Sequence, residues 1–178
     1  MSDHPALKSI GVGVNGDEGK AVPQAFTISG ADFLKDEALF EEHFGPVAIH
    51  VIAEDVAELL KIAEQIPGQL TTSIWANKAD VAEFGGLFNI LEEKAGRLMI
   101  NNMPTGVEVT HAMLHGGPYP ATTDSRSTSV GSQAIYRYTR PVCFQNFPQE
   151  LLPPELQNDN PLQIWRKVDG ELSKDKIA

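Results

Sequence analysis

Residues 41–52 read EEHFGPVAIHVI, and this stretch decides the fold of the chain. Pro46 marks the start of a strand, and the β-branched, apolar run that follows it is typical of a β-strand. Asp55 and Glu58 then form a capping-box pattern at the start of a helix. One face of this helix is apolar at helical spacing, with Val56, Leu59, Leu60, Ala63 and Ile66. The sequence therefore predicts a strand over 47–52 that leads into an amphipathic helix.

The same pair of elements repeats further along the chain. Pro67 and Gly68 end the first helix, and Leu70–Trp75 is predicted as a second strand. Asp80 and Glu83 repeat the capping pattern ahead of a second amphipathic helix. Its apolar face would consist of Val81, Phe84, Phe88, Leu91 and Ala95.

Gly85 and Gly86 lie inside the second helix and favour either a break or close packing there, because each costs about 1 kcal/mol relative to Ala. Arg97–Ile100 then supplies a third short apolar strand. The order strand, helix, strand, helix, strand is the signature of a mainly parallel sheet. We therefore predict an α/β fold of three layers, with a mainly parallel sheet and helices on both faces.

The two ends of the chain lack this regularity. Residues 1–30 are glycine-rich and are predicted to be loop-like up to a short apolar alternation at 25–28. Their glycines do not form a dinucleotide fingerprint, because no strand–helix pattern flanks them. We place one domain over 1–147 and a proline-rich tail over 148–178, which cannot be continuous regular structure. Within that tail, Leu162–Val168 is predicted to add a turn of helix.

Two further elements are predicted between the middle of the chain and the tail. Thr128 or Ser129 can cap a short helix that extends to Tyr138, and Val142–Phe147 is a candidate edge strand. Cys143, the single cysteine, lies in this candidate strand. We interpret it as a buried structural residue.

Composition limits the classes of function. The formal net charge of −10 argues against a nucleic-acid or anionic-membrane partner, because both require clustered Lys and Arg. No run approaches the roughly 18 apolar residues needed to span a bilayer, and residues 1–10 lack the apolar core of a signal peptide. A single cysteine suits a reducing compartment. We expect a cytoplasmic protein.

The run over residues 101–131, NNMPTGVEVTHAMLHGGPYPATTDSRSTSVG, has no apolar period. Irregular segments of this length inside a compact domain are uncommon and are usually binding loops or disordered. This run lacks the charge density of a solvated tail, so we interpret it as an ordered pocket loop. It follows the third predicted strand, and ligands of parallel sheets gather at the carboxyl ends of strands.

Residues 41–46 and 101–131 together resemble the C-terminal part of the NAD(P)-dependent aldehyde dehydrogenase superfamily, in which an E-x-F-G-P segment precedes a strand and belongs to the cofactor site. The run over 105–131 is similar to the branch that oxidises 2-oxoglutarate semialdehyde and related aldehydes. The resemblance covers nearly the whole chain but only part of a family member. It implies NAD or NADP and a small aldehyde for the complete enzyme, and no cofactor for the isolated chain.

The resemblance assigns roles to Glu42 and Phe44. The family's glutamate hydrogen-bonds the hydroxyls of the nicotinamide ribose, and its aromatic residue packs near the nicotinamide ring. The residue types suit these roles, because a carboxylate accepts from two neighbouring hydroxyls and a flat apolar side chain orients a ring. Without the resemblance, Glu42 would be an exposed charge before a turn.

The resemblance also implies that the start of the long loop borders the aldehyde entrance. The residues concerned are Pro104, Thr105, Gly106, Val107, His111 and His115. Glu108 and the two histidines have a spacing that one helical turn could present to a metal ion, but the surrounding Gly and Pro residues disfavour a helix. We therefore predict structural histidines bonded to the loop backbone and no metal.

Arg126 offers a bidentate partner for the carboxylate of an acid semialdehyde. An internal contact with Asp124 that pins the loop is the alternative. The common family pattern here is P-F-G-G-x-K-x-S-G, whereas this chain reads GGPYPATTDSRS at 116–127. Residue roles outside the semialdehyde branch therefore do not transfer.

Three hypotheses follow. The first is a C-terminal fragment of an aldehyde dehydrogenase that is inactive alone, with no catalytic residue in this chain, because the family nucleophile lies upstream of E-x-F-G-P. The second is a non-catalytic small-molecule-binding or oligomerisation module on the same fold. The third is a small metallohydrolase that uses His111 and His115. In the first two cases, exposed apolar surface predicts a homo-oligomer, specifically a dimer through 142–147 or the uncovered sheet face.

Overall fold

The computed structural model describes residues 3–14 and 19–177. The chain divides into two compact units, Met1–Tyr138 and Thr139–Ala178. The first unit contains both of the stretches that carry the family resemblance.

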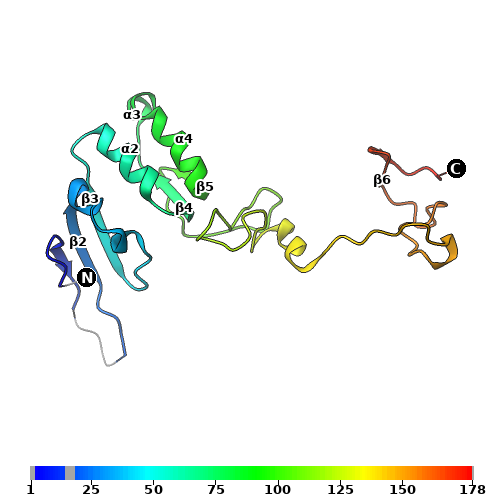
Figure 1. Ribbon diagram of the computed structural model, residues 1–178, viewed down its shortest axis with the longest axis horizontal. Helices are drawn as coiled ribbons and strands as arrows, with labels where there is room; N and C mark the ends of the chain where they lie inside the picture. Colours follow the sequence, from blue (N-terminus) through cyan, green and yellow to red (C-terminus); the bar gives the residue numbers. More distant parts are fainter. Residues whose placement is uncertain (1–2, 15–18, 178) are drawn as a thin grey trace. The chain divides into compact units, whose positions relative to one another are not determined.

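A mixed sheet opens the first unit and has the strand order β1-β2-β3 (Figure 1). Its strands are β1 (Lys8–Val12), β2 (Gln24–Ser29) and β3 (Val47–Ile52). β1 is antiparallel to β2, and β2 is parallel to β3, with Phe26 opposite Ile49 and Ile28 opposite Val51. The predicted strand over 47–52 is confirmed.

The prediction that residues 1–30 are loop-like up to 25–28 is wrong over 8–12, because β1 forms there, whereas β2 coincides with the short apolar alternation at 25–28. Every residue of β1 is exposed, so the strand shows no alternation of buried and exposed positions. It is defined by its backbone pairing with β2, with an irregularity between Ser9 and Gly11. Gly16 lies outside the described residues.

A helical layer covers one face of this sheet. It contains α1 (Gly30–Phe33), the 3₁₀ helix η1 (Glu37–Phe40) and α2 (Val56–Gln65). The core between this layer and the sheet consists of Ile28 from β2 and of Phe33, Leu39 and Ile62 from the layer itself. The predicted helix start is confirmed, because the Asp55 carboxylate accepts from the Glu58 backbone N–H at 2.8 Å.

A second, two-stranded parallel sheet follows, made of β4 (Gln69–Ile74) and β5 (Ala95–Ile100). Two helices, α3 (Lys78–Glu83) and α4 (Gly85–Lys94), connect these strands. The helix breaks at Phe84, as the neighbouring glycines allowed. The predicted cap at Asp80 is wrong. Asn77 is the N-cap and Asp80 occupies the third helical position, where its carboxylate accepts from the Asn77 N–H.

The α/β class is confirmed, since two pairs of parallel strands alternate with helices. The parallel strands lie in two separate sheets, and among the described residues β3 does not pair with β4. No helix in the described part of the chain is long and apolar enough to cross a membrane.

A 3₁₀ helix, η2 (Ser132–Tyr138), ends the first unit in place of the predicted capped helix. Thr128 does not cap it. The Thr128 hydroxyl instead donates to the Val130 carbonyl at 2.7 Å and accepts from the His115 N–H at 2.8 Å.

The second unit is built from turns and one hairpin. Its elements are the 3₁₀ helix η3 (Gln149–Leu151), β6 (Arg166–Val168) and β7 (Glu171–Ser173). The predicted helical turn over 162–168 is wrong, because β6 turns into β7 at Asp169 and Gly170, whose φ angles are 49° and 95°. An Asp-Gly pair with two positive φ angles is the signature of a tight hairpin turn.

The predicted edge strand over 142–147 is also wrong. This stretch has no strand pairing, and its two aromatic rings pack edge to face at 5.2 Å. Cys143 within it is exposed, so the prediction of a buried structural thiol is wrong as well. An apolar run forms a strand only where a neighbouring strand pairs with its backbone, and among the described residues this stretch has none.

Candidate functional site

The Glu42–Pro46 segment connects η1 to β3 through a glycine-dependent turn. Gly45 has a φ of 146°, a conformation that side chains disfavour. The turn is held by the Val47 N–H, which donates to the Gly45 carbonyl at 2.8 Å, and by the Gln24 N–H, which donates to the Pro46 carbonyl at 2.9 Å. Glycine is therefore required where the chain enters β3.

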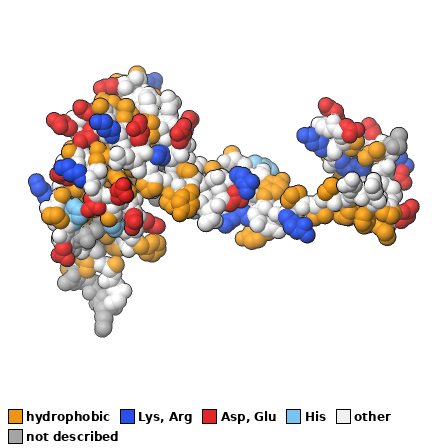
Figure 2. Space-filling model, in the orientation of Figure 1, with side chains coloured by type: hydrophobic (Ala, Val, Ile, Leu, Met, Phe, Trp, Pro, Cys, Tyr) orange, Lys and Arg blue, Asp and Glu red, His pale blue; other side chains and the backbone are white. Residues whose placement is uncertain are grey.

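Glu42 lines a hollow of about 1130 Å³. Glu37 and Glu41 contribute two more carboxylates, and Gln69, the first residue of β4, contributes an amide. Acidic side chains are also spread over the visible face of this unit (Figure 2). Carboxylates and amides are acceptors for sugar hydroxyls, so the lining suits a polyhydroxylated ligand.

The same hollow joins the two stretches that carry the family resemblance. Pro120 and Ala121 from the long loop line it together with Glu42. Phe44 does not belong to this lining, and its side chain is 96% exposed. An aromatic ring this exposed is open to a ligand or to another part of a larger protein.

The long loop is anchored to the second sheet at its beginning. Asn101, with a φ of 52°, exchanges two hydrogen bonds with the backbone of Ala76, at 2.9 and 2.8 Å. Arg97 on β5 donates from Nη1 to the Gly106 carbonyl at 2.9 Å. These bonds tie the first residue of the loop to Ala76, just after β4, and its Pro104–Val107 segment to β5.

Glycines bring the middle of the loop against the starts of β4 and β5. A Cβ added at Gly96 would meet the Gly116 carbonyl, and one added at Gly117 would meet the Gln69 carbonyl. Gly68 is equally close to the carbonyls of Pro118 and Tyr119. The loop backbone therefore packs directly on the sheet backbone, which only residues without a Cβ permit.

The loop also closes on itself. The Ser129 N–H donates to the His115 carbonyl at 3.0 Å, and the Ser132 N–H donates to the Thr110 carbonyl at 3.1 Å. His115 is thus bonded through its backbone, while its Nδ1 is buried without a partner. His111 is exposed. Over residues 3–14 and 19–177, no group of three or more His, Cys, Asp or Glu is placed to hold a metal ion.

Arg126 contacts Asp124 within the loop, with its Nε 3.1 Å from the carboxylate. The backbone N–H of Arg126, followed by its side chain, lowers the pKa of Asp124. The internal contact considered above is therefore present. Neither Arg126 nor the exposed Pro104–Val107 turn lines the Glu42 hollow.

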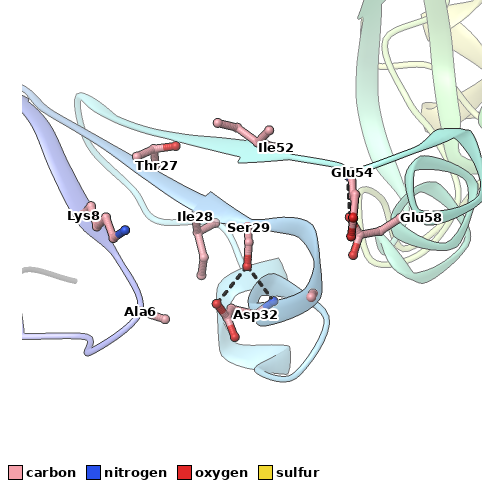
Figure 3. A pocket seen from close by; sticks show the side chains of 10 residues that line it. Ala6, Lys8, Thr27, Ile28, Ser29, Asp32, Ile52, Glu54 and Glu58 are labelled. Atoms are coloured by element: carbon pink, nitrogen blue, oxygen red, sulfur yellow. Dashed lines mark hydrogen bonds between the residues drawn. The ribbon is translucent and has the colours of Figure 1, made fainter.

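A second hollow, of about 400 Å³, lies where β2 and β3 end (Figure 3). Its polar groups bond to one another: the Ser29 hydroxyl donates to Asp32 at 2.8 Å, and the Glu54 N–H donates to Glu58 at 2.7 Å. Lys35 outside the hollow is the main cause of the lowered pKa of Asp32. These groups are already satisfied, so the Glu42 hollow is the stronger candidate site.

Comparison with known proteins identifies the family. The alpha-ketoglutaric semialdehyde dehydrogenase of Acinetobacter baylyi is 48% identical over 151 residues, which cover 85% of this chain and 28% of that protein. Alpha-ketoglutaric semialdehyde dehydrogenase 2 of Azospirillum brasilense is 41% identical over 172 residues, 96% of this chain and 33% of that protein. This chain belongs to the aldehyde dehydrogenase superfamily. It spans about a third or less of the length of these relatives.

Solved structures agree on the aldehyde dehydrogenase fold. The NAD-bound delta-pyrroline-5-carboxylate dehydrogenase of Mycobacterium tuberculosis superposes with a TM-score of 0.56 at 17% identity, over 85% of this chain and 28% of that one. A second structure of the same enzyme gives a TM-score of 0.56 at 18% identity, over 85% of this chain and 29% of that one. No protein-family model matches the chain.

Several features of the site were not found from the sequence. Glu37 and Glu41 share the Glu42 hollow, and Arg97 holds the loop turn. Gly68 and Gly96 flank predicted strands, and a glycine beside a strand is a recognised signal for close backbone approach. The sequence therefore carried a signal for close backbone approach at these glycines, but it did not show which carbonyl groups they approach.

Proposed function

We propose that this chain forms part of an NAD(P)-dependent aldehyde dehydrogenase that oxidises 2-oxoglutarate semialdehyde, or a related aldehyde, to an acid. The observation that carries the proposal is the 48% identity to a relative named for that substrate. The hollow shared by Glu42 and the long loop supports it, because the two stretches with the resemblance line the same space. In the complete enzyme we expect the three-layer arrangement, with a mainly parallel sheet and helices on both faces.

Glu42 and Phe44 bind the cofactor in this proposal. The Glu42 carboxylate accepts hydrogen bonds from the ribose hydroxyls, and Phe44 packs near the nicotinamide ring. Both side chains are exposed and free to take these partners. NAD and NADP are equally compatible with these two contacts.

The loop residues Pro104–Val107, His111 and His115 border the aldehyde entrance in this proposal. Their position is held by Arg97 and by the loop's own backbone bonds. For Arg126 to bind the carboxylate of an acid semialdehyde, it must exchange its contact with Asp124 for the substrate. The contact with Asp124 is largely exposed, so giving it up costs little.

These 178 residues alone are expected to be inactive. Their one cysteine, Cys143, follows the E-x-F-G-P segment, whereas the family nucleophile precedes it. The test is a chimera in which this chain replaces the matching segment of the Acinetobacter baylyi relative. The chimera should reduce NAD or NADP with 2-oxoglutarate semialdehyde, as followed by absorbance of the reduced nicotinamide, and the isolated chain should not. An inactive but folded chimera contradicts the proposal.

Self-association is the second part of the proposal. Val142, Phe144 and Phe147 expose apolar side chains in the second unit, with exposed fractions of 57%, 39% and 42%. Apolar groups gathered at a surface favour a partner, and a two-fold dimer is the commonest closed assembly. Light scattering at micromolar concentration should give the mass of a dimer. A monomer contradicts this part alone, and a dimer without chimera activity favours the non-catalytic oligomerisation module.

A cytoplasmic location is proposed because the chain has a single cysteine, which suits a reducing compartment.

A further inference from the structure

We propose that Arg97 is a positioning residue for the aldehyde. Its guanidinium holds both ends of residues 106–113, which we call the entrance lobe, and thereby sets how tightly the enzyme binds its aldehyde. This inference deepens the proposed function and rests on it, because the lobe borders an aldehyde entrance only in such an enzyme. Arg97 lies outside both stretches that carry the family resemblance, so the resemblance assigns it no role.

A single nitrogen atom of Arg97 reaches both ends of the entrance lobe. Its Nη1 donates to the carbonyl of Gly106, where the lobe begins, at 2.9 Å. The same Nη1 donates to the Sδ of Met113, where the lobe ends, at 3.7 Å. Because the side chain extends from β5, the base of the lobe is tied to a strand.

The end of the long loop closes the base of the lobe from another direction. Gly131 has a φ of 92°, and a Cβ added there would lie 2.9 Å from the Thr110 carbonyl and 3.0 Å from the Cβ of Met113. The Ser132 N–H donates to the same Thr110 carbonyl at 3.1 Å. The lobe contains no helix or strand, so these contacts and those of Arg97 determine its position.

The side chains that the lobe presents are open to a ligand. Val109 is 81% exposed, Val107 is 41% exposed, and His111 is exposed. A binding segment that is already held in place loses less conformational freedom when a ligand binds. Release of the base should therefore weaken aldehyde binding even though Arg97 itself need not touch the aldehyde.

The contacts of Arg97 favour positioning over direct binding of the substrate carboxylate. Arg126 pairs with Asp124, whereas among the described residues no carboxylate forms an ion pair with Arg97. Nη1 of Arg97 is committed to the lobe, and its Nε is buried without a hydrogen-bond partner. Arg97 does not line the Glu42 hollow, so its effect should be confined to the aldehyde.

Steady-state kinetics of the chimera described above test the proposal. Arg97→Lys keeps the charge but not the planar fork of donors, and Arg97→Gln removes the charge. Both should raise KM for 2-oxoglutarate semialdehyde about tenfold, with KM for the cofactor and kcat changed by less than about twofold. Arg140→Lys is the matched control, since Arg140 is an exposed arginine outside the lobe and should leave all three constants unchanged.

Met113→Leu tests the other end of the lobe. It keeps the side-chain volume and removes the sulfur acceptor. KM for the aldehyde should rise by only about threefold, because the stronger bond from Arg97 to the Gly106 carbonyl remains. A larger rise than in Arg97→Gln would contradict the clamp.

Amide hydrogen exchange, followed by NMR in the isolated chain, measures the clamp without catalysis. The Ser132 N–H reports on the lobe through its bond to Thr110, and the Ser129 N–H, bonded to His115, is the matched control outside the lobe. Both Arg97 variants should accelerate exchange of Ser132 by about fivefold or more. Unchanged exchange of Ser129 shows that the rest of the loop stays folded.

Each outcome decides the proposal. A raised KM for the aldehyde in both Arg97 variants, with faster exchange of Ser132, supports it. A raised KM in Arg97→Gln alone assigns the effect to charge and overturns it. Unchanged KM in both variants, or an equal rise for aldehyde and cofactor, also overturns it and leaves the proposed function intact. A folded but inactive chimera contradicts the proposed function, and unchanged exchange of Ser132 then overturns the clamp as well.

Discussion

The Glu42–Pro46 segment and the Asn101–Gly131 loop both lack helix and strand, yet they differ in how they are held. The loop is bonded to β5 by Arg97, to Ala76 by Asn101 and to the sheet backbone by close glycine contacts. The Glu42 segment is held by main-chain bonds at its end, and the side chains of Glu42 and Phe44, the proposed cofactor contacts, are exposed. The loop is thus fixed by contacts within the chain, whereas the side chains of Glu42 and Phe44 are exposed to solvent.

The largest expected effect is on cofactor binding by the exposed side chain of Glu42. In the chimera, Glu42→Gln should weaken cofactor binding about tenfold or more, because a hydrogen bond to a charged group contributes about 1.5 to 3 kcal/mol. Glu41→Gln is the matched control, since Glu41 lines the same hollow and has no assigned contact with the cofactor. Titration of protein fluorescence with NAD and NADP measures both. Equal weakening by the two variants would show a general charge effect.

The packing of the long loop on the second sheet is disrupted most directly by a substitution at one of the close glycine contacts. Gly96→Ala forces a Cβ against the Gly116 carbonyl and should destabilise the chain by about 1 to 3 kcal/mol, as overpacking does. Gly86→Ala in α4 is the control, because a Cβ there meets nothing within 4 Å and should stabilise the helix by up to about 1 kcal/mol. Urea unfolding measures both changes. Equal stability of Gly96→Ala and the unsubstituted chain would mean that the loop moves freely off the sheet.

A smaller effect is expected at the loop entrance. Asn101→Ala removes two hydrogen bonds to Ala76 and leaves Ala at a φ of 52°, for a loss of about 1 to 2 kcal/mol. Asn101→Gly removes the same bonds but tolerates the backbone angle, so it should lose less. Urea unfolding and the exchange rates of loop amides separate the two causes. A greater loss with Gly than with Ala would contradict the account of the backbone angle.

The smallest effect is a pH dependence outside both regions. A hydrogen bond from His4, and then one from the Ala38 N–H, lowers the pKa of Asp36. A carboxyl whose pKa falls on folding stabilises the fold above its unfolded pKa, and this contribution is lost as the pH falls below about 4. Asp36→Asn should therefore lower the melting temperature slightly at pH 7 and leave it unchanged near pH 2. Thermal unfolding across that range measures the difference, and an equal shift at both pH values would refute the assignment.

The strand–helix order of the first unit was predictable because neighbours in the sequence encode it. The apolar run after Pro46 forms β3, and Asp55 caps α2 as expected. β1 escaped prediction because all its residues are exposed, so hydrophobic alternation carries no signal there. The hairpin at Asp169–Gly170 had a sequence signal in the Asp-Gly pair, but the proline-rich context outweighed it.

The candidate site also has features that the sequence predicted and features that it did not. The Glu42 and Phe44 motif and the position of the long loop were evident from the sequence, while the hollow that joins Glu42 to Pro120 was not. Cys143 shows the opposite error, since an apolar neighbourhood in the sequence did not bury its side chain. Burial requires a packing partner, and a partner can come from anywhere in the chain or from outside it.

By itself, the sequence determined the α/β class, the family and the residues from which a site can be made. Only the tertiary structure decided that the parallel strands form two sheets, and that glycines hold the loop on the second sheet. The physical reason is the separation in sequence between the residues that interact. Helix caps and strand periodicity arise between residues a few positions apart, whereas the pairing of strand edges and close backbone contacts such as Gly96 with Gly116 depend on residues that only folding brings together.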